Sequence, residues 1–148
     1  MLKKFALILI FLLVALQFIR PPKNQSTAPA DNDIGMVYSI PAEVHGILKQ
    51  KCYDCHSNNT RYPWYSAIQP AGWWMYKHIR DGKRELNFSE FRTYPARKAA
   101  HKLEETIELV QQKEMPLKSY LWMHPEARVS PEEEEKLVAW VRSLGVGK

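Results

Sequence analysis

The sequence predicts a small all-α protein, and three observations support that fold class. Apolar residues recur every three or four positions in residues 96–110 and 137–144, which is the spacing of one helix face. Proline precedes both stretches where a helix would begin, and the second stretch also has a Ser-x-x-Glu capping box. No stretch alternates apolar and polar residues as a half-buried strand does, and the sequence has no internal repeat and no glycine-rich phosphate loop.

Composition and charge narrow the class of protein. The 148 residues suit one domain plus a short extra segment, and 45% apolar and 11% aromatic residues are enough for a packed core. The formal net charge is +5, but residues 1–23 hold four basic residues and no acidic one, so the rest of the chain is close to neutral. Because no basic stripe follows the domain, we expect no nucleic-acid partner.

The first element is an apolar N-terminal segment. Lys3 and Lys4 precede an unbroken apolar run from Phe5 to Ile19, the pattern of an export signal or signal anchor. As a helix, these 15 residues would span about 22 Å, short of the roughly 30 Å hydrocarbon core, and membrane thinning or snorkelling cations would cover the difference. We expect residues 1–22 to form an uncleaved transmembrane anchor, although Ala28-Pro29-Ala30 resembles a signal cleavage site.

The remaining elements form one helical domain, residues 41–148, after a linker. Residues 23–40 are rich in Pro, Ser, Asn and Asp, which predicts the linker. Helix signals predict a helix over residues 41–51, one over 72–81 with Gly82 as its stop, one over 95–113, and a last one from Pro131. Residues 83–91 and 114–129, which lack a helical period, predict irregular connections.

Cys52, Cys55 and His56 form a Cys-x-x-Cys-His motif with three candidate chemistries. A structural zinc site needs four ligands, and the other histidines are scattered without a His-x-x-x-His pair. A thiol–disulfide pair is typical of a strand-to-helix setting, whereas a helix is predicted before this motif, and a plain structural disulfide makes no use of His56. Attachment of haem c uses all three residues and agrees with export of the domain.

Haem attachment also explains the spacing of the motif. Two cysteines three positions apart lie on one side of a helical turn, where their sulfurs can add to the two vinyl groups of one porphyrin. The next residue, His56, then offers its imidazole as the proximal iron ligand. We therefore expect one haem c, bound covalently through Cys52 and Cys55.

Met115 is the best candidate for the second axial ligand that a low-spin electron carrier needs. It follows the predicted long helix, and Pro116 forces the chain away from helical geometry, which leaves the thioether on a loop. Met123 on the same loop is the second candidate. We expect His101 to be solvated and His124 to cap the final loop.

Further residues are expected around the haem. Arg61 is a candidate partner of the haem propionates. The expected walls of the haem pocket are apolar, aromatic or soft side chains: Trp64, Tyr65, Trp73, Trp74, Met75, His78, Leu117 and Trp122.

The chain resembles the bacterial mono-haem proteins of the haem-binding domain family, which are of the cytochrome c type. The matching pieces are CYDCHSNNTRYPWYSAIQPAGWW, LNFSEF and EMPLKSYLWMHPEARVSPEEEEKLVAW, together with the apolar N-terminus. The resemblance implies a fold like class I cytochromes c, in which the helix before Cys52 and the final helix pack across each other. It also implies thioethers at Cys52 and Cys55, with His56 as proximal and Met115 as distal ligand.

These features predict an electron-transfer protein rather than an enzyme. We expect a carrier anchored in the bacterial inner membrane, with its haem domain facing the periplasm and docking transiently to redox partners. The alternative is a haem-based ligand sensor or peroxidase-like enzyme in which Met115 leaves or never binds, with His78 or His124 as the acid–base residue. A third hypothesis is a haem-free module held by a Cys52–Cys55 disulfide.

Overall fold

Helices form the architecture of residues 1–145, the part of the chain that this computed structural model describes, and no strand occurs within them. The predicted all-α class is therefore confirmed. The α-helices are α1 (Leu2–Leu16), α2 (Ala42–Lys51), α3 (Tyr53–His56), α4 (Ala71–Glu85), α5 (Ala96–Gln111), α6 (Lys118–Leu121) and α7 (Pro131–Ser143). Short 3-10 helices join them: η1 (Ile34–Met36), η2 (Trp64–Ala67), η3 (Phe88–Thr93) and η4 (Pro125–Ala127).

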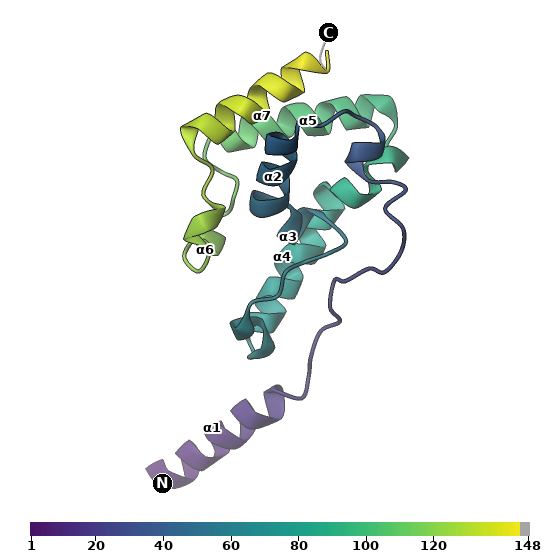
Figure 1. Cartoon of the computed structure of the whole chain (residues 1–148). Helices are drawn as coiled ribbons and strands as arrows, with labels where there is room; N and C mark the ends of the chain where they lie inside the picture. The colour runs from purple at the N-terminus through teal and green to yellow at the C-terminus, as the bar shows by residue number, and fades with distance from the viewer. Residues whose placement is uncertain (146–148) are drawn as a thin grey trace.

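The core lies where α7 packs across α2 and α5 (Figure 1). The apolar stripes predicted for these three helices supply its buried side chains: Val44, Ile47 and Leu48 from α2, Ala99, Leu103 and Val110 from α5, and Leu137, Trp140 and Val141 from α7. The capping box at the start of α7 forms as predicted, with Glu133 N donating to Ser130 Oγ and Ser130 N donating to the Glu133 carboxylate. The expected contact between the helix before Cys52 and the final helix is present.

Helix α4 extends beyond the predicted stop at Gly82 and ends at Glu85. Gly82 has another purpose, because a Cβ there would lie 2.9 Å from the backbone oxygen of Cys55. The missing side chain lets α4 approach α3 closely. Part of the connection predicted as irregular over residues 83–91 is therefore helical, and η3 forms most of the rest. One short helix, α6, also occurs within the connection predicted over residues 114–129.

Helix α1 projects away from the domain, as Figure 1 shows, and has no buried residue. Its 15 residues end at Leu16, where the chain passes into turns. No helix within residues 1–145 combines the length and the apolar character needed to cross a membrane. The expectation of a transmembrane helix is corrected at this point, because a helix of this length rises only about 22 Å.

Residues 23–40 lie against the domain instead of forming the expected free linker. Ile34 is fully buried in the core. Asn24 donates from its backbone N to the Tyr62 hydroxyl at 2.7 Å and from its side chain to the Ser57 carbonyl at 2.8 Å. These contacts attach the segment to the chain just after the Cys-x-x-Cys-His motif.

Candidate functional site

The Cys-x-x-Cys-His motif lies at a bend between two helices. Helix α2 ends at Lys51, and Cys52 leaves helical geometry with φ −122°. The single turn of α3 follows, in which the backbone N–H groups of Cys55 and His56 both donate to the Cys52 carbonyl, at 3.2 and 3.0 Å. Both cysteines are free thiols. This tight turn brings the two thiols and the imidazole to one side of the chain.

A cavity of about 330 Å³ brings the predicted site residues together. Cys52, Cys55, His56 and Met115 all line it. Among the expected wall residues, Trp74, Met75, His78 and Leu117 line the cavity, whereas Trp64, Tyr65, Trp73 and Trp122 do not. Met123, the second candidate for the distal ligand, also lies outside it and is 55% exposed.

His56 is held in the tautomer that a metal ligand needs. Its Nδ1 lies 3.0 Å from the carbonyl oxygen of Leu86, and a carbonyl only accepts, so Nδ1 carries the proton. The lone pair is then on Nε2, and the hydrogen bond fixes the ring orientation. Burial lowers the pKa of His56 below its usual value, so the imidazole stays neutral and available to a metal.

The two thiols are not activated. Burial raises the pKa of Cys52 and of Cys55 to about 12, and neither thiol deprotonates at neutral pH. A thiol–disulfide catalyst needs the opposite shift, a pKa depressed towards neutrality. The electrostatics of the motif therefore disfavour redox catalysis by the thiols themselves.

Met115 reaches the cavity because of the way α5 ends. Lys113 adopts the left-handed conformation with φ 59°, which stops the helix and turns the chain. The backbone N–H groups of Glu114 and Met115 then donate to the Leu109 carbonyl, at 2.9 and 3.1 Å. This closed turn holds the half-buried Met115 side chain at the cavity wall.

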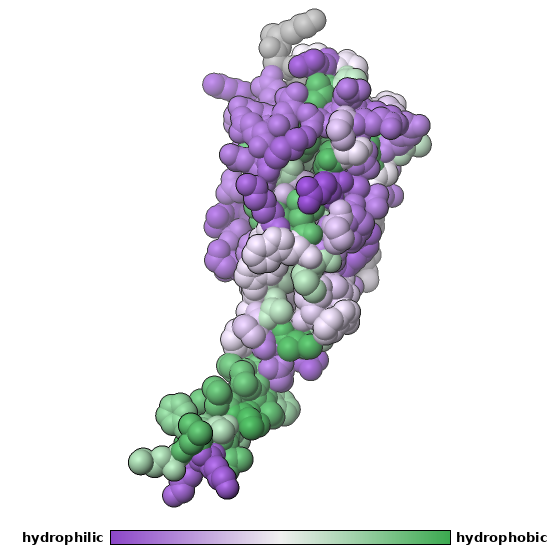
Figure 2. Space-filling view, turned by 90° about the vertical axis from the view of Figure 1, so that its left-hand side faces the viewer, coloured by the Kyte–Doolittle hydropathy of each residue, from purple (hydrophilic) through white to green (hydrophobic). Residues whose placement is uncertain are grey.

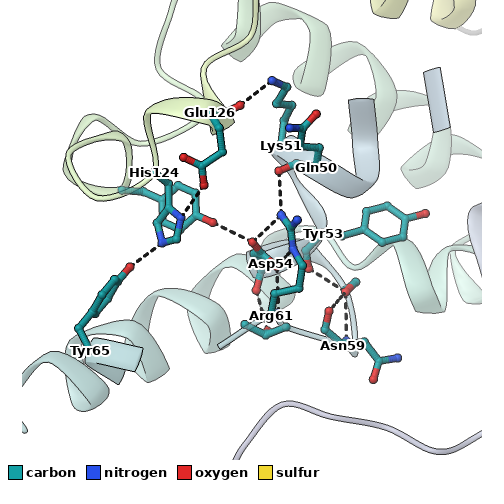
Figure 3. A network of polar contacts seen from close by, with 12 residues as sticks. Gln50, Lys51, Tyr53, Asp54, Asn59, Arg61, Tyr65, His124 and Glu126 are labelled. Carbon is teal, nitrogen blue, oxygen red and sulfur yellow. Dashed lines mark hydrogen bonds and ion pairs between the residues drawn. The ribbon is translucent and has the colours of Figure 1, made fainter. Parts of the chain in front are cut away.

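Asp54, inside the motif, is a buried cavity residue that the sequence analysis missed. Its buried carboxylate accepts hydrogen bonds from the backbone and side chain of Arg61 at 3.0–3.1 Å, and from the Tyr120 hydroxyl at 2.8 Å (Figure 3). Arg61, expected at the haem propionates, is the ionic partner of this carboxylate and does not line the cavity. Tyr120 lies in α6, so the network ties the Met115 loop to the attachment motif.

Two further contacts hold the same loop in place, and Figure 3 shows both. Lys51 donates to the backbone carbonyl of Glu126 at 2.6 Å. His124 bridges the Tyr65 hydroxyl at 2.5 Å and the Glu126 carboxylate at 3.0 Å, while its ring stacks on Tyr120. His124 precedes η4 as its N-cap residue without a side-chain capping hydrogen bond, and its ring joins the loop to η2 through Tyr65.

The donor set fits a haem. Two thiols, a neutral imidazole with a free Nε2 and a thioether face one largely apolar cavity, and these are the groups that attach and ligate haem c. No group of three or more His, Cys, Asp or Glu side chains that could by itself hold a metal ion occurs within residues 1–145. Fold and site together define a small helical haem-binding protein.

Comparison with known families agrees with this class. A family model described as "Haem-binding domain" matches residues 11–143, so the chain belongs to the haem-binding domain family. The searches of curated proteins and of solved structures gave no match.

Proposed function

We propose that this chain is a c-type mono-haem electron carrier, exported through its N-terminal segment and held at the periplasmic side of the bacterial inner membrane. The observation that carries the proposal is the cavity that joins Cys52, Cys55 and His56 to Met115. Met115 follows the three motif residues by 59 to 63 positions in sequence, and α5 with its closing turn brings all four side chains to the same cavity. The likeness to class I cytochromes c belongs to the same proposal.

Each residue has a distinct role in this proposal. A bound haem supplies an iron that exchanges one electron. His56 offers Nε2 to one side of the metal, and its hydrogen bond to the Leu86 carbonyl keeps the ring from rotating. Met115 would offer a soft, weakly basic sulfur as a second ligand, which would raise the reduction potential. Cys52 and Cys55 hold the group covalently, so it stays bound in an exported protein.

The cavity environment supports electron transfer over ligand chemistry. Buried apolar side chains, Met75, Leu86, Phe88 and Val110, line it and exclude water from the metal. Of the two histidines that a peroxidase-like enzyme would use, His124 lies outside the cavity and is engaged with Tyr65 and Glu126. His78 lines the cavity, but its Nδ1 bonds the Trp74 carbonyl in its own helix.

The test is the spectrum of the full chain, produced in a bacterium that matures c-type cytochromes. We expect a pyridine haemochrome of the two-thioether type, haem that stays with the denatured chain, and a ferric long-wavelength band from thioether ligation. Met115→Ala should abolish that band, lower the reduction potential and admit carbon monoxide to the ferrous iron. Met123→Ala, a matched change at an exposed methionine, should leave all three properties unaltered.

Two results would contradict the proposal. A correctly folded, exported chain without haem would support the disulfide-held module instead. A wild-type protein that binds carbon monoxide readily and lacks the thioether band would support the sensor or peroxidase-like alternative.

A further inference from the structure

The surface of the molecule changes character along its long axis. Figure 2 shows a hydrophobic helix at one end, weakly polar side chains on the neighbouring part of the domain, and strongly hydrophilic side chains towards the far end. The hydrophobic end is α1, on which Phe5, Ile8 and Phe11 are each more than half exposed. Apolar, then aromatic, then charged side chains are the order in which residue types favour the lipid core, the headgroups and water.

The end of α1 is joined to the domain by specific polar contacts. Gln17 Nε2 donates to the Gln69 carbonyl at 3.2 Å, and Gln69 N donates back to Gln17 Oε1 at 2.9 Å. Trp73 Nε1 donates to the Ile19 carbonyl at 2.8 Å. These three bonds fix the direction of the domain relative to α1. They link the residues at the end of α1 to Gln69, which lies between η2 and α4, and to Trp73 in the first turn of α4.

The part of the domain beside this joint is aromatic and exposed. Trp64 is 76% exposed, Ile68 is 49% exposed and Trp74 is 40% exposed. Trp64 lies in η2, Ile68 directly follows η2, and Trp74 lies in the first turn of α4, all within five positions of Gln69. Trp73 adds an indole whose N–H is bonded and whose ring is only partly buried. Tryptophan is the residue that favours the boundary between lipid and water.

The charge distribution fits an anionic surface at the same end. Residues 1–30 and 55–80 contain none of the 16 acidic residues, although they carry several Lys and Arg. Lys3, Lys4 and Arg20 form no ion pair with any described residue, and Lys23 lies over the Tyr62 ring. A protein partner would cover one face of α1, whereas the apolar side chains of α1 are exposed around the whole helix. Lipid surrounds a helix on all sides.

We propose that α1 and the aromatic end of the domain, residues 64–74, form one lipid-binding face that seats the domain on an anionic bilayer in a fixed orientation. Helix α1 enters the apolar layer, Trp64 and Ile68 lie among the headgroups, and Arg20 and Lys23, which follow α1 on the domain side, meet anionic lipid. The cavity, farther along α4, then faces the aqueous side. This inference rests on the exported, retained N-terminus of the proposed function but requires no haem.

The experiment uses the full chain with vesicles of phosphatidylcholine, with and without added phosphatidylglycerol. Anionic lipid should raise binding by about fivefold for each cation that reaches the surface, and salt should reduce the gain. Vesicle binding should slow amide hydrogen exchange in residues 64–74 and leave residues 118–129 unchanged. Brominated lipid should quench the wild-type tryptophan fluorescence.

Matched variants test the orientation. Trp64→Ser should lose much of the quenching by brominated lipid, whereas Trp122→Ser, at an 85% exposed tryptophan just after α6, should lose none. The proposed face would be overturned if both variants lost the same amount of quenching. It would also be overturned if vesicle binding did not slow amide exchange in residues 64–74. A mature chain that begins after residue 20 would overturn it as well. Haem content, read from the haemochrome, tests the proposed function separately from all of these results.

Discussion

Replacing Gly82 by alanine tests the close approach between α4 and the attachment motif. The added Cβ would lie 2.9 Å from the Cys55 backbone oxygen and 3.3 Å from the Cys55 Cβ. Backbone cannot rotate away as a flexible side chain can, so α3 or α4 must shift. Because Cys55 is a proposed attachment residue, the shift acts directly on the site.

The size of the effect follows from two opposing contributions. Alanine stabilises a helix interior by about 1 kcal/mol relative to glycine. Overpacking against a fixed neighbour costs about 1–3 kcal/mol. With a contact this short against backbone, we expect the upper part of that range, so Gly82→Ala should lower the free energy of unfolding by about 1–2 kcal/mol.

Gly46→Ala is the matched control, since Gly46 also lies inside a helix, α2, and a Cβ there meets nothing within 4 Å. It should raise the free energy of unfolding by up to about 1 kcal/mol. Urea denaturation compares the free energies of unfolding of the two variants. The fraction of molecules that carry haem through two thioether bonds measures the effect on attachment. If Gly82→Ala were as stabilising as Gly46→Ala, the argument for a close approach would be refuted.

Three further perturbations address the loop, the N-terminal segment and the buried imidazole. Tyr120→Phe removes a hydrogen bond to the Asp54 carboxylate, which should destabilise the Met115 loop by about 1.5–3 kcal/mol, read as faster amide exchange in residues 112–129. Ile34→Ala should lower the free energy of unfolding by about 2–5 kcal/mol, and a change below 1 kcal/mol would return residues 23–40 to a linker role. The haem-free chain should lose stability as pH falls below about 6.5, because burial lowers the pKa of His56 and the unfolded chain takes up the proton first; His56→Gln should flatten that slope.

Local patterns were enough to predict the helices that build the core. The apolar stripe of α5 and the capping box of α7 are signals that tertiary contacts do not override. The same holds for Met115, because a helix end followed by proline places a side chain on a turn. Its position at the cavity and the gathering of Cys52, Cys55 and His56 around the same space agree with the sequence prediction, while ligation itself stays a prediction.

Other features depend on contacts between distant residues. Gly82 has the sequence signal of a helix stop, and only the proximity of Cys55 reveals that it serves close packing. Asp54 occupies a variable position of the attachment motif, and its partners Arg61 and Tyr120 lie 7 and 66 positions away. The composition of residues 23–40 is that of a linker, but one isoleucine in it completes the core.

The hydrogen bond between Tyr120 and Asp54 implies an order of assembly. Asp54 lies between Cys52 and Cys55 in sequence, and Tyr120 lines the same cavity as both thiols, so their hydrogen bond holds part of the loop at the wall of the space that a covalently attached haem would enter. We expect a maturation enzyme to load the chain while residues 112–129 are still unfolded against the rest. Folding of residues 112–129 onto the domain is then the last step, and it closes the cavity over a haem that is already attached.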